Sequence, residues 1–334
     1  GGGGGVLLSP PSPPSLPVAP CHWKHPPCEP VNRLGSRQQA GPHPPEGGGA
    51  SLDTGRKTVN RKHYYNNEEG RWHHVWHQSD LKKLDMCPEQ ARFIWSGAVN
   101  DIQGDGAALG TACHYAVEQV LSLQDGRTPS DLAYGVMVEA FDQGLSDITP
   151  TIEGWNSYKT VDKMTSVGQT KLDGWYNDVY PNLTPTDRVE ESFKKVFYED
   201  DERVVTLAGQ VDLIDANYGV VDWKFPKRDY TKEKWQYERW DVQSTVYCWA
   251  MGLPQMTFFV MHGSSGATSS MTIDRGPGDF SFLWRKIEAA CRLVEATDLT
   301  VWPLNDAGWW CSEKWAPCWS VCKGKRAASE DANG

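Results

Sequence analysis

The chain has 334 residues, a formal net charge of −10 and a hydrophobic fraction of 39%. This length suits one large domain or two small ones, and the composition is typical of a globular protein with long loops. The acidic balance argues against a general nucleic-acid coat protein, which should be basic. The sequence contains no run of about 18 apolar residues, so no membrane span is predicted. An enzyme that acts on nucleic acid is not excluded, because its basic residues need to line only one groove.

The nine cysteines are odd in number and unevenly spread. A secreted disulfide scaffold would be short, with regular cysteine spacings. The N-terminal stretch also lacks the basic region and the apolar core of a signal peptide. We therefore expect a cytoplasmic protein, in a reducing intracellular environment, whose clustered cysteines bind metal.

The two ends of the chain have the composition of disordered tails. Residues 1–70 are mostly Gly, Pro and polar residues, which cannot bury a core, and residues 326–334 are expected to form a second tail. Cys21, His25 and Cys28 in the first tail are residue types that bind zinc. Incidental cysteines in a disordered segment are the favoured interpretation.

Helices are predicted for the first part of the ordered region, which is expected to begin near Trp72. Ser79 is a suitable N-cap, and Pro88 interrupts the helix that begins there. Apolar residues recur at helical spacing after residue 110. The predicted helices cover residues 79–86, 89–95, 111–123 and two stretches between 130 and 180.

Strand periodicity begins near residue 188. Residues 188–198 alternate between apolar and polar, and Glu191 would lie on the apolar side, either at the open end of this strand or near a metal site. The charged stretch over 224–239 is either a solvated loop or a phosphate-binding patch. A helix over 240–251, strands over 256–262 and 270–273, and a helix over 281–297 complete the expected elements. Strands in the middle of the chain with helices around them predict an α/β core.

A hairpin over residues 209–225 carries the residues with the clearest chemistry. Its two strands are predicted over 209–214 and 219–225, with turn-forming residues between them. Antiparallel pairing would put Asp212 opposite Asp222, with Cβ atoms about 5 Å apart. Lys224 would share the face of Asp222, because side chains alternate along a strand.

Two carboxylates at this separation repel each other, and a divalent cation between them would remove the repulsion. Oxygen ligands of this kind suit Mg²⁺ or Mn²⁺. Lys224 could then help to stabilise an anion held by that cation. The alternative interpretation is a surface hairpin whose charged residues form a salt bridge.

The hairpin resembles the core of PD-(D/E)XK nucleases in their RecB-like exonuclease branch, through Gly-x-Val-Asp at residues 209–212 and Val-Asp-x-Lys at 221–224. Further signatures of that branch occur in the same order, and the resemblance covers about residues 78–324. They are a Cys-Pro closing the segment 79–88, Gly-x-x-x-His over 110–114, Gln-x-x-x-Tyr over 243–247 and a cysteine-rich tail over 311–322.

The resemblance implies an α/β fold with a restriction-endonuclease-like core, in which helices flank a central mixed sheet, and a cysteine-rich C-terminal clasp. The nuclease domain would span residues 71–325. An entry helix over 78–96 and a tail over 302–324 would form the clasp.

The resemblance also assigns roles to residues outside the hairpin. It implies that His114 completes the metal shell of Asp212 and Asp222, and a nitrogen ligand favours Mn²⁺ over Mg²⁺. It implies that Gln243 and Tyr247 lie near the active site and the DNA.

The cysteines that the resemblance singles out are Cys87, Cys311, Cys318 and Cys322, which would hold a [4Fe–4S] cluster. Four thiolates suit iron–sulfur or zinc. The tail departs from the family pattern, because Ala316 stands close to the position where the middle ligand is expected, with Cys318 two residues further on. The remaining cysteines of the ordered region are expected to be buried thiols; they are Cys113, Cys248 and Cys291.

The expected function is metal-dependent hydrolysis of phosphodiester bonds in DNA by an exonuclease, acting on single strands or DNA ends. The protein would be similar to the CRISPR-adaptation-associated exonucleases and their phage-encoded relatives, with a role in recombination, repair or spacer acquisition. A zinc-stapled endonuclease of the same fold and a catalytically inactive DNA-binding module are the alternatives. The intact Asp212, Asp222 and Lys224 argue against the inactive module.

Overall fold

The computed structural model describes residues 58–60, 62–101, 103–123, 128–186, 188–296 and 302–322. Its centre is an eight-stranded sheet with the order β1-β2-β3-β5-β6-β7-β8, in which β4 pairs with β5 beside this path. The sheet is mixed, because β3 runs parallel to β5 and β6 parallel to β7, while the other neighbours are antiparallel. The strands are β1 (Thr58–Asn60), β2 (His63–Asn66), β3 (Arg71–Trp76), β4 (Val189–Glu199), β5 (Arg203–Asp215), β6 (Gly219–Lys224), β7 (Gln255–His262) and β8 (Ala267–Asp274).

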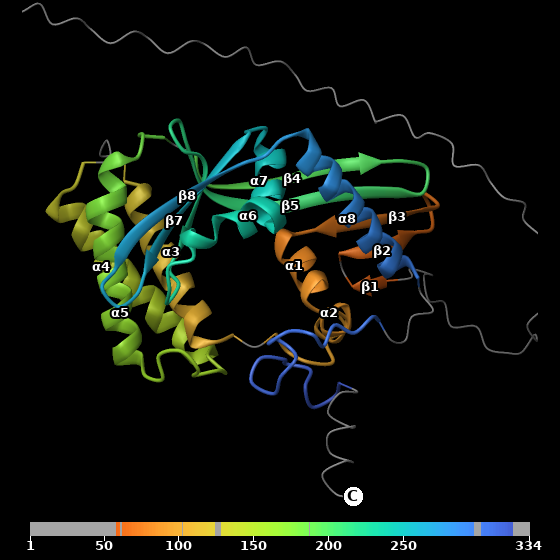
Figure 1. Cartoon of the computed structure of the whole chain (residues 1–334), viewed down its shortest axis with the longest axis horizontal. Helices are drawn as coiled ribbons and strands as arrows, with labels where there is room; N and C mark the ends of the chain where they lie inside the picture. Colours follow the sequence, from red (N-terminus) through yellow and green to blue (C-terminus); the bar gives the residue numbers. More distant parts are fainter. Residues whose placement is uncertain are drawn as a thin grey trace, which may run out of the picture. The chain divides into compact units, whose positions relative to one another are not determined.

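Helices cover both faces of the sheet (Figure 1). The α-helices are α1 (Gln78–Met86), α2 (Pro88–Trp95), α3 (Asp105–Leu121), α4 (Asp131–Ile148), α5 (Val161–Gly174), α6 (Lys234–Trp240), α7 (Val242–Met251) and α8 (Pro277–Glu295). Shorter helical turns are η1 (Thr149–Thr151), η2 (Trp175–Val179), η3 (Tyr180–Asn182) and η4 (Thr231–Glu233). None of the described helices is long and apolar enough to cross a membrane.

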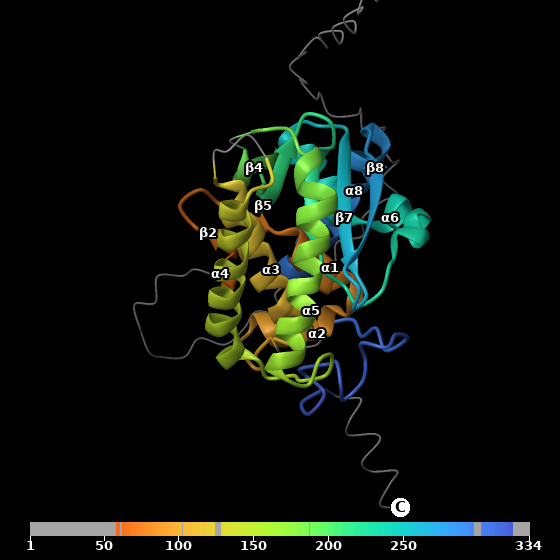
Figure 2. The same cartoon turned by 90° about the vertical axis from the view of Figure 1, so that its left-hand side faces the viewer.

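Two hydrophobic cores lie on opposite faces of the sheet. Helices α3, α4 and α5, side by side in Figure 2, pack on the face where β6 presents Val221 and Trp223. Helices α1, α7 and α8 pack on the other face, where β6 presents Val220. The alternation of side chains along β6 therefore feeds both cores, and this confirms the expected α/β fold with a central mixed sheet between helices.

Several local predictions differ from the structure. The helix predicted over 111–123 begins at Asp105, and the strand predicted over 209–214 begins at Arg203. The start of order near Trp72 is wrong, because β1 and β2 precede it within the segment expected to be a tail. The first helix begins at Gln78 with His77 as its N-cap, so Ser79 lies inside the helix. The helix predicted over 240–251 is divided at Asp241, whose side chain accepts a hydrogen bond from the backbone N–H of Ser244 and so caps α7.

Other predictions fall on residues that the structure does not describe. Cys21, His25 and Cys28, which were interpreted as incidental to a tail, lie outside the described residues, as do most of the first tail and all of the second. The described elements all belong to one unit, Asp53–Gly334.

A charged cluster joins β3, β5 and α8 at the edge of the second core. Glu295 Oε1 lies 2.9 Å from Nε2 of the buried His74. Arg203 donates two hydrogen bonds to the Glu295 carboxylate, from Nε at 2.6 Å and from Nη2 at 2.8 Å. Burial alone would raise the pKa of Glu295, but the hydrogen bonds from His74 and Arg203 hold it at about 2.

We expect Glu295→Gln to lower the free energy of unfolding at neutral pH by about 2 kcal/mol, because it removes the charge that Arg203 binds in two places. In the unfolded chain this carboxyl has its ordinary pKa of 4.5. The stabilisation is therefore complete above that pH and is lost as pH falls towards 2, so the two proteins should converge there. Urea unfolding at a series of pH values measures both effects.

The matched control is Glu202→Gln, because Glu202 contacts the same Arg203 at 3.3 Å but its side chain is 78% exposed. This exchange should cost less than about 0.5 kcal/mol. Equal urea midpoints for wild type and Glu295→Gln at neutral pH would contradict the role of the cluster.

Candidate active site

The two aspartates of the central hairpin face each other inside the protein. Leu213 pairs with Val221 in the β5–β6 ladder, so the next positions along the two strands bring Asp212 opposite Asp222. Both carboxylates are buried. Asp212 Oδ2 accepts a hydrogen bond of 2.8 Å from the backbone N–H of Trp223, which ties the first carboxylate to the strand that carries the second.

Asp222 is held by partners from its own strand and from α7. Lys224 Nζ lies 2.5 Å from Asp222 Oδ2. Gln243 Nε2 donates a hydrogen bond of 2.5 Å to Asp222 Oδ1. The structure thus brings three predicted site residues together on one face of β6, the face opposite to Val221 and Trp223.

His114 reaches the site from α3, in the helical layer on the other face. Its Nδ1 lies 3.3 Å from Asp212 Oδ2. Its ring meets the ring of Phe225 edge to face, with centroids 5.7 Å apart. The structure therefore places His114 beside Asp212, as the Gly-x-x-x-His resemblance implies.

The exit of β6 is anchored by a lysine that the sequence does not single out. Lys171 in α5 is fully buried, and its Nζ donates hydrogen bonds of 2.7 Å to the carbonyl oxygens of Phe225 and Pro226. These contacts hold the backbone directly after Lys224, and they hold the Phe225 ring against His114. Burial lowers the pKa of Lys171 to about 8.

Glu190 is a site residue that sequence reasoning missed. Burial raises its pKa to about 8, and the nearby carboxylates of Asp212, Glu118 and Asp222 add to this rise. Glu191 was expected either at the open end of the strand or near a metal site. It lies at the start of β4, two residues before the buried Phe193, and its carboxylate pairs with Arg188 at 2.6 Å, which agrees with the open-end alternative.

The reason that Glu190 was missed is a local break in strand geometry. Glu190 has a φ of 50°, which places it in the left-handed region although it is not a glycine. Simple alternation fails at such a residue. Two adjacent glutamates at the start of a strand were the signal in the sequence, but the pattern alone does not tell which one turns inward.

The site has an excess of buried negative charge. Burial raises the pKa of Asp212, the neighbouring His114 opposes this rise, and Asp222 adds to it. Asp222 Oδ2 is buried and, within the described residues, has the ion pair with Lys224 but no hydrogen bond. Both observations are expected of carboxylates whose compensating charge is a cation.

The donor set at this position suits a hard divalent cation. Two aspartate carboxylates supply the oxygen atoms that Mg²⁺ or Mn²⁺ takes from proteins, and His114 adds a nitrogen. Within the part of the chain that the structure describes, no group of three or more His, Cys, Asp or Glu side chains is already arranged around a metal position.

Tyr247 lies one turn after Gln243 on α7, but its ring is buried. The ring meets that of Phe193 edge to face at 5.8 Å. A Cβ atom at Gly209 would lie 2.8 Å from the Phe193 ring and 3.3 Å from the Tyr247 ring, so this glycine permits the close approach. In this structure the Tyr247 ring is a packing group of the second core, and it is too buried to stack on a DNA base.

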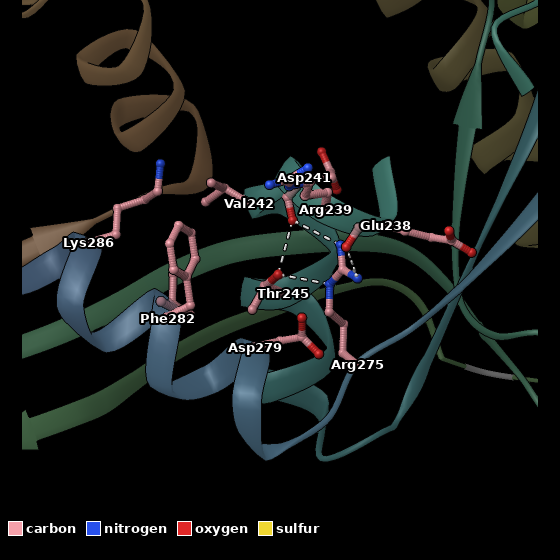
Figure 3. A pocket seen from close by; sticks show the side chains of 10 residues that line it. Glu238, Arg239, Asp241, Val242, Thr245, Arg275, Asp279, Phe282 and Lys286 are labelled. Atoms are coloured by element: carbon pink, nitrogen blue, oxygen red, sulfur yellow. Dashed lines mark hydrogen bonds between the residues drawn. The ribbon is translucent and has the colours of Figure 1, made fainter. Parts of the chain in front are cut away.

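A cavity of about 300 Å³ opens beside the first turn of α7 (Figure 3). Its lining includes Asp241, Phe282 and Lys286. The buried Arg275 is not available for a ligand there, because its nitrogens donate to Thr245 Oγ1 and to four backbone carbonyl oxygens. The acceptors include the carbonyls of Tyr237, Glu238 and Asp241, so Arg275 closes the end of α6.

The four cysteines of the proposed clasp line one small cavity between α2 and the tail. Cys87 is the N-cap of α2, and the other three come from the described end of the tail, which lies beside α2 in Figure 1. The tail is joined to α2 through Glu89, whose N–H donates to the carbonyl of Pro303 at 3.2 Å and whose Oε2 accepts from the N–H of Trp302 at 2.8 Å. The cysteines of this cavity are Cys87, Cys311, Cys318 and Cys322.

The three other described cysteines are fully buried in the two main cores. Burial raises the pKa of the thiols of Cys113, Cys248 and Cys291. This agrees with the prediction that they are packing residues.

Comparisons with known proteins address the family of the chain. No curated protein sequence matches it. Among solved structures, the chain is similar to the protein SSO0001, at 13% sequence identity over 75% of this chain and 87% of that one, with a TM-score of 0.35. It is also similar to a protein from Eubacterium rectale described as a "putative exonuclease", at 13% identity over 70% of this chain and 86% of that one, with a TM-score of 0.42.

A sequence profile described as the PD-(D/E)XK nuclease superfamily matches residues 76–259, more than half of the chain. The matched segment begins at the end of β3 and ends within β7, so it includes the hairpin, His114 and Gln243. The chain belongs to the PD-(D/E)XK nuclease superfamily.

Proposed function

We propose that this protein is a metal-dependent DNA exonuclease that hydrolyses phosphodiester bonds. Its active site would consist of Asp212, Asp222, Lys224 and His114. The observation that carries the proposal is that His114, which is distant in the sequence, meets the hairpin residues Asp212, Asp222 and Lys224 where β5 and β6 pair. Superfamily membership gives the reaction class.

The residues of the site have separable tasks in this reaction. A divalent cation held by Asp212, Asp222 and His114 would draw charge from the scissile phosphate and lower the pKa of bound water. Lys224, beside Asp222, places a positive charge where negative charge develops on the phosphate. Gln243 fixes the orientation of Asp222 through its amide, and Trp223 fixes Asp212 through its backbone N–H.

The finer assignment is to the RecB-like branch, with single-stranded DNA or DNA ends as the substrate. The order of the motifs supports it: Cys-Pro, Gly-x-x-x-His, the hairpin, Gln-x-x-x-Tyr and the cysteine-rich tail. Recombination, repair or CRISPR spacer acquisition, in a reducing intracellular compartment, is the role that this branch implies.

We further propose that Cys87, Cys311, Cys318 and Cys322 hold a [4Fe–4S] cluster that fastens the tail to α2. The support is that all four thiols line the same cavity, although Cys87 and the tail are far apart in the sequence. Four thiolates also suit zinc, which is the alternative occupant.

We expect Asp222→Asn to reduce cleavage of single-stranded DNA more than about 100-fold, because the amide lacks the charge that binds the cation. DNA binding should remain, since the exchange preserves shape and the acceptor for Gln243. Initial rates with Mn²⁺ or Mg²⁺ and fluorescence anisotropy of a labelled oligonucleotide measure the two properties.

Asp201→Asn, at an exposed aspartate in the turn between β4 and β5, is the matched control and should cut like wild type. A fully active Asp222→Asn protein would end the proposal of a metal site at this position. A wild type that binds DNA without cutting it in either metal would favour the inactive binding module.

For the clasp, we expect anaerobically purified protein to be brown, with absorbance near about 400 nm, and to contain about four iron atoms per chain. Cys322→Ala should lose most of the iron, whereas Cys248→Ala, in a buried thiol of the second core, should retain it. Metal analysis by mass spectrometry distinguishes the occupants. A colourless wild type with stoichiometric zinc would replace the cluster by the zinc alternative.

A further inference from the structure

Lys82 on α1 connects the solvent to the carboxylates of the candidate active site. Its side chain is 42% exposed, and Nζ lies 3.2 Å from Gln243 Oε1 and 3.5 Å from Asp241 Oδ1. The other end of the Gln243 amide donates to Asp222 Oδ1. One side chain therefore separates the ammonium group of Lys82 from a carboxylate at which the proposed chemistry takes place.

The negative charge of the site makes a positively charged side chain favourable for DNA binding at this position. The chain is acidic overall, and the buried carboxylates of Asp212 and Asp222 face each other at the site. A phosphodiester strand that approaches them is repelled unless positive charge stands nearby. Lys224 is paired with Asp222 at 2.5 Å, whereas Lys82 has a longer ion pair with Asp241, at 3.5 Å, and a half-exposed side chain.

The geometry leaves Lys82 able to bind a further group. An ammonium has three donors, and within the described residues two acceptors lie near Nζ, on Gln243 and Asp241. Asp241 also uses its carboxylate to cap α7, through Oδ2, so it is a shared partner of Lys82. One Lys82 donor is therefore available for a phosphate oxygen.

We propose, as a deepening of the proposed function and resting on it, that Lys82 binds a backbone phosphate of the DNA strand next to the scissile one. It is a positioning residue, because it holds the strand in register with Asp222 and does not contact the reacting atoms. The side-chain amide of Gln243 links this phosphate contact to the active site, because it accepts from Lys82 and donates to Asp222.

The competing explanation is purely structural: Lys82 orients Gln243, and Gln243 orients Asp222. The two explanations predict different measurements. A phosphate contact affects DNA affinity and its salt dependence, whereas an orienting role affects the turnover number and leaves the salt dependence unchanged.

Lys83 offers a matched control on the same helix. It is the next residue, is similarly exposed at 33%, and its Nζ pairs with Asp101 at 2.6 Å on another side of α1. Lys83→Met removes the same net charge as Lys82→Met, so it corrects for the change in overall charge.

The test compares wild type, Lys82→Met, Lys82→Arg and Lys83→Met. Binding of a fluorescein-labelled single-stranded oligonucleotide is measured by anisotropy at several salt concentrations, without divalent metal. We expect Lys82→Met to raise Kd about fivefold and to reduce the slope of log Kd against log salt by about 0.7, the value for one phosphate contact on a single strand. Lys82→Arg should retain most of the slope, and Lys83→Met should behave like wild type.

Cleavage kinetics in Mn²⁺ complete the test, with Lys82→Met expected to raise KM and to change kcat less than about twofold. An unchanged salt slope with a reduced kcat overturns the proposal in favour of the orienting role. An equal loss of slope in Lys83→Met also overturns it, because the effect would then be one of net charge.

Failure of the proposed function is distinguishable from failure of this inference. A wild type that binds but never cuts DNA, with a reduced slope in Lys82→Met, removes the nuclease activity and retains the phosphate contact. A wild type that cuts DNA, with the same slope in Lys82→Met, removes the contact and retains the nuclease.

Discussion

The candidate site depends on one register, that of β5 against β6, which places the carboxylates of Asp212 and Asp222 side by side in the interior. Two buried negative charges destabilise a fold unless other groups compensate them. Here the compensation comes from both helical layers, because His114 belongs to α3 on one face and Gln243 to α7 on the other. Lys224 follows on the same strand as Asp222. The site is therefore complete only when both layers are packed on the sheet, which couples its geometry to the whole fold.

Helix α1 and its continuation extend this coupling to the cysteine cavity. Lys82 on α1 contacts Gln243, and the same helix ends at Cys87, which begins α2 and lines the cavity with the tail. A metal group that fastened the tail to α2 would thereby also fix the end of α1. This gives the clasp a physical purpose beyond holding the end of the chain, since it would stabilise the wall from which Lys82 reaches the substrate.

The parts of the site that could be predicted are those that depend on local periodicity. Alternation along two short strands and a turn at Asn217 were enough to place Asp212 opposite Asp222 and Lys224 on the same face. His114 came from the resemblance, since helical spacing alone does not reveal that α3 docks at the end of this hairpin. The α/β class followed from the order of helices and strands.

The parts that could not be predicted depend on tertiary contacts or on unusual backbone geometry. Glu190 has a positive φ, and strand alternation alone does not show that such a residue turns inward. Lys82 and Lys171 acquire their contacts only from the packing of α1 on α7 and of α5 on the end of β6.

The most direct test of the proposed active site is digestion of linear single-stranded DNA, labelled separately at each end, with Mn²⁺ or Mg²⁺, beside a Lys224→Ala protein. Wild type alone should shorten the DNA progressively from one end. Equal degradation by Lys224→Ala would contradict the assignment of the active site, and internal cuts would contradict the exonuclease assignment.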